Sequence, residues 1–178
     1  MNIKYDKKEL LKHKIKHVDI KKFNSIPLID SFDDMAFQSR NLARACKIYD
    51  KMLNDKECTN ILCLAGSLVS GGLKKVIIEL IKNNMIDVIV STGAIVVDQD
   101  FFEGLGFNHY RGFINVDDNQ LRQLMIDRIY DTFIDEEDLR VCDMTIKQIA
   151  DEMQPGAYSS REFIYKTVSY THLRAHET

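Results

Sequence analysis

Apolar residues recur at helical spacing in several segments of the chain, and polar residues separate these segments. The spacing predicts helices over residues 7–15, 33–53, 98–105, 118–130 and 135–153. A loop or extended stretch is predicted over residues 23–30, because Pro27 disfavours helical geometry in Ile26. A final helix is predicted to begin at the capping box Ser159-Ser160-Arg161-Glu162, in which the first serine and the glutamate exchange hydrogen bonds.

Between the second and third of these helices, the pattern changes to short apolar runs. Residues 61–65 form one run, which stops at Gly66-Ser67, and an amphipathic segment over residues 72–82 follows. A second run over residues 85–90 is rich in β-branched residues and stops at Ser91. Continuous apolar runs are typical of parallel strands that are covered on both faces. The order therefore predicts two buried parallel strands joined by a crossover helix, in an α/β fold.

The first of these strands ends in a glycine-rich turn, residues 65–72, with the sequence Ala-Gly-Ser-Leu-Val-Ser-Gly-Gly. Glycines between a strand and a helix let backbone amides approach a phosphate, and the helix N-terminus favours negative charge. The turn matches neither the dinucleotide fingerprint G-x-G-x-x-G nor the Walker A pattern. Glycines that serve packing alone explain such a turn equally well.

The second strand ends at Ser91-Thr92-Gly93-Ala94, and three acids follow: Asp98, Asp100 and Glu103. In a parallel sheet the carboxyl ends of adjacent strands open onto one crevice, so both turns are expected to face the same ligand. The acids could bind ribose hydroxyls or the ammonium groups of a polyamine. Stabilisation of a first helical turn by acidic residues is the open alternative.

Composition narrows the classes of protein that these residues allow. A length of 178 residues suits one domain, and 29% charged residues with a net charge of −3 give no sign of a nucleic-acid partner. The lysines between Lys4 and Lys22 are interpreted as a solvated helix face rather than an RNA or membrane surface. No apolar run approaches a membrane span, so a cytoplasmic protein is expected. The four cysteines are predicted to be reduced core thiols, with no metal site.

Several segments of the chain, in the same order, resemble the deoxyhypusine synthase family. The resemblance covers residues 17–167, and the segments that carry it are 64–77, 84–94, His17-Val-Asp, Phe37-Gln-Ser-Arg-Asn-Leu, Gln99-Asp-Phe-Phe-Glu, His109-Tyr, Arg128-Ile-Tyr-Asp and Tyr158-Ser-Ser-Arg-Glu-Phe. It implies a Rossmann-like fold, which is a doubly wound, mostly parallel sheet with flanking helices. It also implies a homotetramer with active sites between subunits.

The resemblance further implies a transferase that uses NAD and spermidine. In the family, NAD takes hydride from spermidine, and the aminobutyl group passes through an enzyme lysine to an acceptor amine. The acceptor is a lysine of the translation initiation factor 5A precursor, or putrescine in relatives that make homospermidine. A catalytically dead nucleotide-binding or interaction module with the same fold is the alternative.

The family's NAD-binding segments match two sets of residues in this chain. They are Gly66, Ser67, Leu68, Val69 and Ser70 in the first turn, and Thr92, Gly93 and Ala94 in the second. Where the eukaryotic pattern has adjacent glutamates, this chain reads Val97-Asp98-Gln99-Asp100, and a shift of two positions is possible. Asp98 is assigned to the polyamine.

The family's nucleophilic lysine and catalytic histidine lie in its carboxy-terminal half, and no lysine here matches that motif. Residues 1–167 are therefore interpreted as the amino-terminal part of a single NAD-binding domain, with no catalytic residue and no activity of its own. Residues 168–178 resemble a translated adaptor and are interpreted as a non-native tail. His172 and His176 in this tail have zinc-ligand spacing, which chance explains better than a metal.

Overall fold

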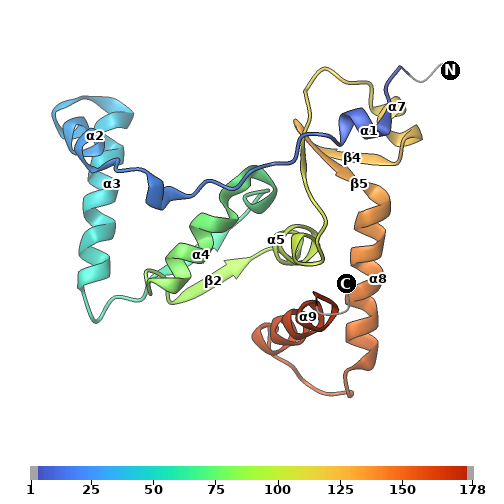
Figure 1. The fold of residues 1–178 in the computed structure, drawn as a ribbon. Coiled ribbons are helices and arrows are strands. Elements are labelled where there is room, and N and C mark those ends of the chain that lie inside the picture. The colour runs from blue at the N-terminus through green and yellow to red at the C-terminus, as the bar shows by residue number, and fades with distance from the viewer. Residues whose placement is uncertain (1–3, 176–178) are drawn as a thin grey trace. The chain divides into compact units, whose positions relative to one another are not determined.

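The computed structural model describes residues 4–175 as a mixed α/β structure with more helix than strand. The chain divides into two units, each of which is described by itself (Figure 1). The first unit comprises residues 1–16, 65–72 and 91–178, and the second comprises residues 17–64 and 73–90. Both strand-end turns of the predicted ligand site therefore belong to the first unit.

The second unit contains a two-stranded parallel sheet and the helices that precede and join its strands. Its elements are η1 (Ile20–Lys22), α2 (Ile26–Ser31), η2 (Phe32–Asp34), α3 (Phe37–Asn54), β1 (Ile61–Leu64), α4 (Lys74–Lys82) and β2 (Val88–Ser91, of which Ser91 is counted in the first unit). The helix α4 lies in sequence between the paired strands β1 and β2. This order confirms the predicted strand, turn, helix and strand.

Two predictions for this part of the chain are wrong. The strands are not buried, since Ile61 in β1 is 57% exposed and Val90 in β2 is 55% exposed. A sheet of two strands gives each strand one neighbour, so it covers less apolar surface than a wide sheet does. The segment predicted as a loop forms α2, with Pro27 in its first turn, where a helix needs no backbone N–H donor.

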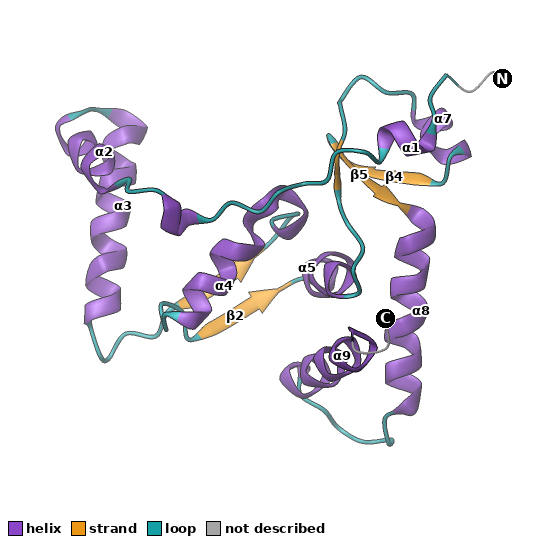
Figure 2. Ribbon diagram, viewed as in Figure 1, coloured by secondary structure: helices purple, strands orange, loops and turns teal. Residues whose placement is uncertain are grey.

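The first unit contains a three-stranded antiparallel sheet in the order β3-β5-β4 and the two long helices α8 and α9 (Figure 2). Its elements are α1 (Lys7–Leu10), η3 (Val69–Leu73), α5 (Gly93–Ile95), η4 (Val96–Phe101), α6 (Phe102–Gly104), β3 (Tyr110–Arg111), α7 (Asp118–Gln123), β4 (Ile126–Ile129), β5 (Thr132–Asp135), α8 (Glu136–Glu152) and α9 (Ser160–Ala175). The two stretches α5 and α6 run into η4 and form one helical segment over residues 93–104, with a π-helical middle.

The central strand β5 divides the apolar interior of this unit into two clusters. Neighbouring residues on a strand face opposite sides of the sheet. Phe133, fully buried, packs with Leu10, Leu121 and Ile126 on one side. Ile134 packs on the other side, in a cluster whose other buried members are Phe101, Phe102, Cys142 and Ile149. Both clusters therefore depend on the position of β5.

The predicted helix over residues 118–130 is wrong beyond Gln123. The helix α7 ends there, and a β-hairpin follows in which Ile129 of β4 faces Thr132 of β5. Met125 and Tyr130 adopt left-handed backbone angles, with φ of 54° and 58°, and these angles break the helical path. The predicted helix over residues 7–15 is also too long, because residues 13–15 run beside residues 109–111 through an isolated β-bridge.

The expected fold class is confirmed as mixed α/β, whereas the doubly wound, mostly parallel sheet is not confirmed. In the described residues the parallel part is limited to β1 and β2, and the larger sheet is antiparallel.

Only one cysteine of the four, Cys142, is buried. Cys46 and Cys63 are exposed, so the prediction of core thiols is wrong for these two.

The final helix begins at the predicted capping box. The hydroxyl group of Ser159 accepts a hydrogen bond from the backbone N–H of Glu162 at 3.2 Å, and the Glu162 carboxylate accepts one from the Ser159 N–H at 2.8 Å. The helix α9 continues across the expected start of the tail at residue 168, and Tyr170 packs against the cluster that contains Phe102. His176, of the predicted chance pair, lies outside the described residues.

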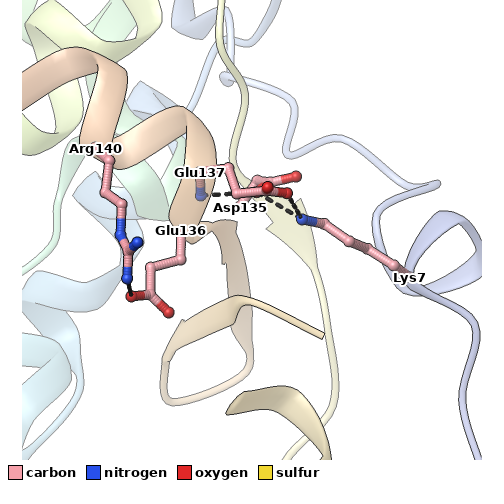
Figure 3. A network of polar contacts seen from close by, with 5 residues as sticks. All are labelled: Lys7, Asp135, Glu136, Glu137 and Arg140. Carbon is pink, nitrogen blue, oxygen red and sulfur yellow. Dashed lines mark hydrogen bonds and ion pairs between the residues drawn. The ribbon is translucent and has the colours of Figure 1, made fainter. Parts of the chain in front are cut away.

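An ion-pair network holds α1 against the start of α8 (Figure 3). The ammonium group of Lys7 lies 2.8 Å from Asp135 and 2.7 Å from Glu137. Asp135 is also the N-cap of α8, where its carboxylate accepts a hydrogen bond from the Glu137 N–H at 3.0 Å. Among the helices described within residues 4–175, none combines the length and the hydrophobicity that a membrane-spanning helix needs.

Candidate functional site

The turn after β1 passes from exposed to buried along its length. Ala65 and Gly66 are exposed, Ser67 and Leu68 are partly buried, and Val69 and Ser70 are buried. Gly66 has a φ of 77°, which favours glycine because it has no side chain. The open part of the turn therefore offers its backbone to a ligand, while the later part anchors it.

Two contacts fix the anchored part of this turn. The carbonyl group of Ser67 accepts hydrogen bonds from the Gly71 N–H at 2.9 Å and from the Ser70 hydroxyl at 3.1 Å. Gly72 has a φ of 94°, and a β-carbon on it would lie 3.0 Å from the carbonyl oxygen of Lys16. The approach of residues 15–16 to the turn thus requires glycine at this position.

The second turn begins the helical segment over residues 93–104. Thr92 is the N-cap, with extended backbone angles, and Thr92, Gly93 and Ala94 are all exposed. A β-carbon built on Gly66 or Gly93 would have no atom of the described residues within 4 Å, apart from those of the residues directly before and after the glycine and, for Gly93, the backbone of its own helix. Both turns therefore leave room for a group to approach the backbone, and the second places it at a helix N-terminus.

A side chain joins the two turns. The backbone N–H of Ser70 donates a hydrogen bond to Oε1 of Gln99 at 3.0 Å, and both residues are buried. Gln99 belongs to the helical segment that starts at the second turn. The predicted residues 66–70 and 92–94 thus lie in the same unit, and Ser70 is hydrogen-bonded to the segment that follows the second turn.

A pocket of about 290 Å³ opens beside the second turn. Its walls come from the second turn, from the helical segment after it, from α8 and from α9; the lining residues are Ser91, Thr92, Gly93, Val96, Val97, Phe101, Ile146, Ser160, Phe163, Ile164 and Thr167. The pocket is mostly apolar, with hydroxyl groups at Ser91, Thr92 and Ser160. The α9 residues were missed by sequence reasoning, because their distance along the chain gives no sign that they reach this turn.

The three acids after the second turn have different environments. Asp98 is partly buried; burial raises the pKa of its carboxyl group, and the Asp143 carboxylate raises it further. Asp100 is exposed. Glu103 lies 2.9 Å from Nδ1 of His109, a histidine that is 2% exposed and packs against the Phe102 ring. Glu103 therefore has a role in the interior, whereas Asp98 belongs to the helical segment that starts at the second turn.

Among residues 4–175, no group of three or more histidine, cysteine or acidic side chains could hold a metal ion. Cys142, whose thiol is acted on by the Asp98 carboxylate, also differs from a reactive thiol. Burial raises the pKa of Cys142 to about 12, and the carboxylates of Asp143 and Asp98 add to this rise. The Cys142 thiol, which donates to the Val97 carbonyl group at 3.5 Å, is therefore protonated at neutral pH.

Comparisons with known proteins give a consistent result. The family model described as deoxyhypusine synthase matches residues 27–175. A deoxyhypusine synthase-like protein of Chlorobaculum tepidum is 63% identical over 90% of this chain and 46% of its own length, and one of Coxiella burnetii is 54% identical over 92% and 47%. A probable deoxyhypusine synthase 2 of Archaeoglobus fulgidus is 42% identical over 72% of the chain and 42% of its own length. The chain spans about half the length of the curated relatives it matches.

Proposed function

The chain belongs to the deoxyhypusine synthase family, and from this membership we propose that the whole protein transfers an aminobutyl group from spermidine to an acceptor amine, with NAD as cofactor. Membership supports a transferase in general. The cofactor, the donor and the acceptor are parts of the proposal. The donor and the acceptor rest on the family membership, and the cofactor site rests also on the hydrogen bond that ties the first turn, through Ser70, to Gln99 in the helical segment after the second turn.

The residues present fit a dinucleotide. The open backbone at Gly66 and the exposed N-terminus of the helical segment at Gly93 suit phosphate oxygens, because both offer backbone N–H groups without steric obstruction. We assign residues 66–70 to one part of NAD and residues 92–94 to another. The apolar pocket beside Thr92 would exclude water from a ring placed there. Bound NAD would supply the hydride acceptor for oxidation of the polyamine.

Asp98 is our candidate for binding the polyamine. Burial first, and the Asp143 carboxylate second, raise the pKa of Asp98, so a positive charge beside this carboxyl group would stabilise its ionised form. An ammonium group of spermidine would supply that charge and lower the pKa again. Oxidation of spermidine further requires that the polyamine lie close to the cofactor, which is consistent with Asp98 following the second turn in the same helical segment.

We assign the nucleophile of the transfer to no lysine of this chain. A lysine becomes a nucleophile when burial or a nearby charge lowers its pKa. Lys7 and Lys21 have raised pKa values instead: for Lys7 burial opposes the rise and the hydrogen bonds to Asp135 and Glu137 cause it, and for Lys21 the hydrogen bond to Glu79 causes it. We expect the chain by itself to be inactive.

The proposal is tested with the whole protein, NAD and spermidine labelled in its aminobutyl part. Label should pass to the factor 5A precursor or to putrescine, and only when NAD is present. Transfer to the precursor would identify a protein-modifying enzyme, and transfer to putrescine a homospermidine-forming one. Label on neither acceptor, with NAD still bound, would contradict transferase activity and favour a nucleotide-binding module.

A further inference from the structure

We propose that Gln99 is a positioning residue that sets the spacing between the two ligand-binding turns. The inference rests on the proposed function, because it concerns the same site. Gln99 is 3% exposed and Ser70 is 1% exposed, and the hydrogen bond between them joins residues 29 positions apart in the sequence. Gln99 is thus assigned a role through Ser70 and not through contact with a ligand.

The hydrogen bond matters because both groups are withdrawn from water. A buried backbone N–H that loses its acceptor keeps the cost of its desolvation without the hydrogen bond that offsets it, so the turn is held where the Gln99 oxygen can reach it. The amide side chain is neutral, so it accepts this bond without the cost of a buried charge. The Ser70 N–H is at the same time withheld from a phosphate, so within the assigned residues 66–70 the backbone N–H groups available to phosphate oxygens are those of the more exposed residues 66–68.

A hydrogen bond connects Ser70 to Ser67, which borders the open part of the turn. The Ser70 hydroxyl donates to the Ser67 carbonyl group at 3.1 Å, and that carbonyl also accepts from Gly71 at 2.9 Å. On the other side, Gln99 is carried by the helical segment that begins at Gly93. One chain of contacts therefore connects the exposed backbone of the first turn with that of the second.

The test measures the dissociation constant for NAD by calorimetry, in the whole protein and its variants. Gln99→Leu keeps most of the side-chain volume and removes the acceptor, and Gln99→Glu keeps an oxygen at the same reach. If the turn adopts its binding geometry in only a tenth of the Gln99→Leu molecules, the apparent dissociation constant rises about 10-fold. Gln99→Glu should bind more tightly than Gln99→Leu. Gln148→Leu, on the exposed face of α8, is the matched control and should bind like the wild type.

A second measurement separates positioning from folding. Hydrogen exchange of the Ser70 amide should be faster in Gln99→Leu than in the wild type, with the melting temperature and circular dichroism showing a folded protein. If Gln99→Leu does not fold, Gln99→Asn replaces it, since its amide is shorter by one methylene group and cannot reach Ser70.

The outcomes distinguish this inference from the function on which it rests. Weaker binding in the folded variants, together with faster exchange at Ser70, supports the positioning role. A folded Gln99→Leu or Gln99→Asn variant with wild-type affinity overturns that role and leaves the proposed function intact. A wild-type protein that binds no NAD overturns both.

Discussion

Asp98 illustrates how two neighbours act on one carboxyl group. Burial is the larger cause of its raised pKa and the Asp143 carboxylate is the smaller one. Asp143→Asn is therefore expected to lower the pKa of Asp98 but to leave it above the ordinary value. Titration of the Asp98 carboxyl carbon by ¹³C NMR measures the change, and an unchanged pKa would show that Asp143 does not act on this group.

The raised pKa of Asp98 also determines whether its contribution to stability grows or falls with pH. A folded-state pKa above the unfolded value means that the fold favours the protonated acid, so the stabilisation from Asp98 is fully present below its unfolded pKa and is lost as pH rises through the folded pKa. Asp143→Asn should make this loss smaller. The free energy of unfolding, compared between pH 3 and pH 7 (roughly either side of the usual carboxyl range), would show it.

Gly112 is required by packing. A β-carbon on it would lie 2.6 Å from the ring of the fully buried Phe133. Gly112→Ala should therefore lower the free energy of unfolding by about 1–3 kcal/mol, as overpacked core substitutions do. Gly71→Ala is the control, because a β-carbon there meets no other described residue within 4 Å. Equal losses in urea unfolding of the two variants would contradict this explanation.

Single residues of the site were predictable only in part. The glycines and hydroxyl residues at residues 66–70 and 92–94 could be selected because they interrupt apolar runs. Gln99 could not be selected, since its role depends on reaching Ser70 across 29 positions. Glu103 was grouped with Asp98 by proximity in the sequence, yet its partner His109 could be identified only from the fold.

Among the helices, α8 offers a clear test of an N-terminal cap. Asp135→Ala removes both the bond to the Glu137 N–H and the ion pair with Lys7, and should cost about 1–2 kcal/mol of unfolding free energy. Asp135→Asn keeps an oxygen for the cap and should cost less. Chemical denaturation compares them. Equal losses would assign the effect to the Lys7 pair and not to the cap.

Elements that follow local rules were predicted well, and elements that depend on distant partners were not. The helix α4, the strands β1 and β2, and the capped start of α9 follow from periodicity and capping. The sequence predicts a helix where the strand β4 forms, because Ile126 and Ile129 stand three positions apart, a spacing that suits a helical face. Pairing across the sheet decides that segment, and Phe133 supplies the buried contact.

At the scale of the whole molecule, the chain exposes large apolar residues that a stable monomer usually covers. Examples in separate elements are Ile61 at 57%, Phe37 at 82% and Met144 at 71% exposure. Such surfaces, with an unpaired sheet edge, favour association, so the 178-residue chain is expected to form assemblies as its concentration rises. Static light scattering measures the mass, and a folded monomer at all concentrations would contradict the expectation.

The mixed α/β class could be predicted because short apolar runs indicate strands and helical periodicity indicates helices in the same sequence. The sequence contains only two apolar runs that predict parallel strands, and the wide parallel sheet is an expectation from the family resemblance. The described structure contains those two strands and adds an antiparallel sheet whose strands carry mixed polar and apolar residues. A short strand such as β3, of two residues, leaves no pattern that a sequence could reveal.

We propose that the two strand-end turns together hold NAD. A crystal structure of the whole protein with NAD tests it most directly. The account predicts NAD phosphate oxygens within hydrogen-bonding distance of the backbone N–H groups of residues 66–68, and the rest of the same molecule against residues 92–94. NAD bound at another place, with both turns facing solvent, would contradict the account.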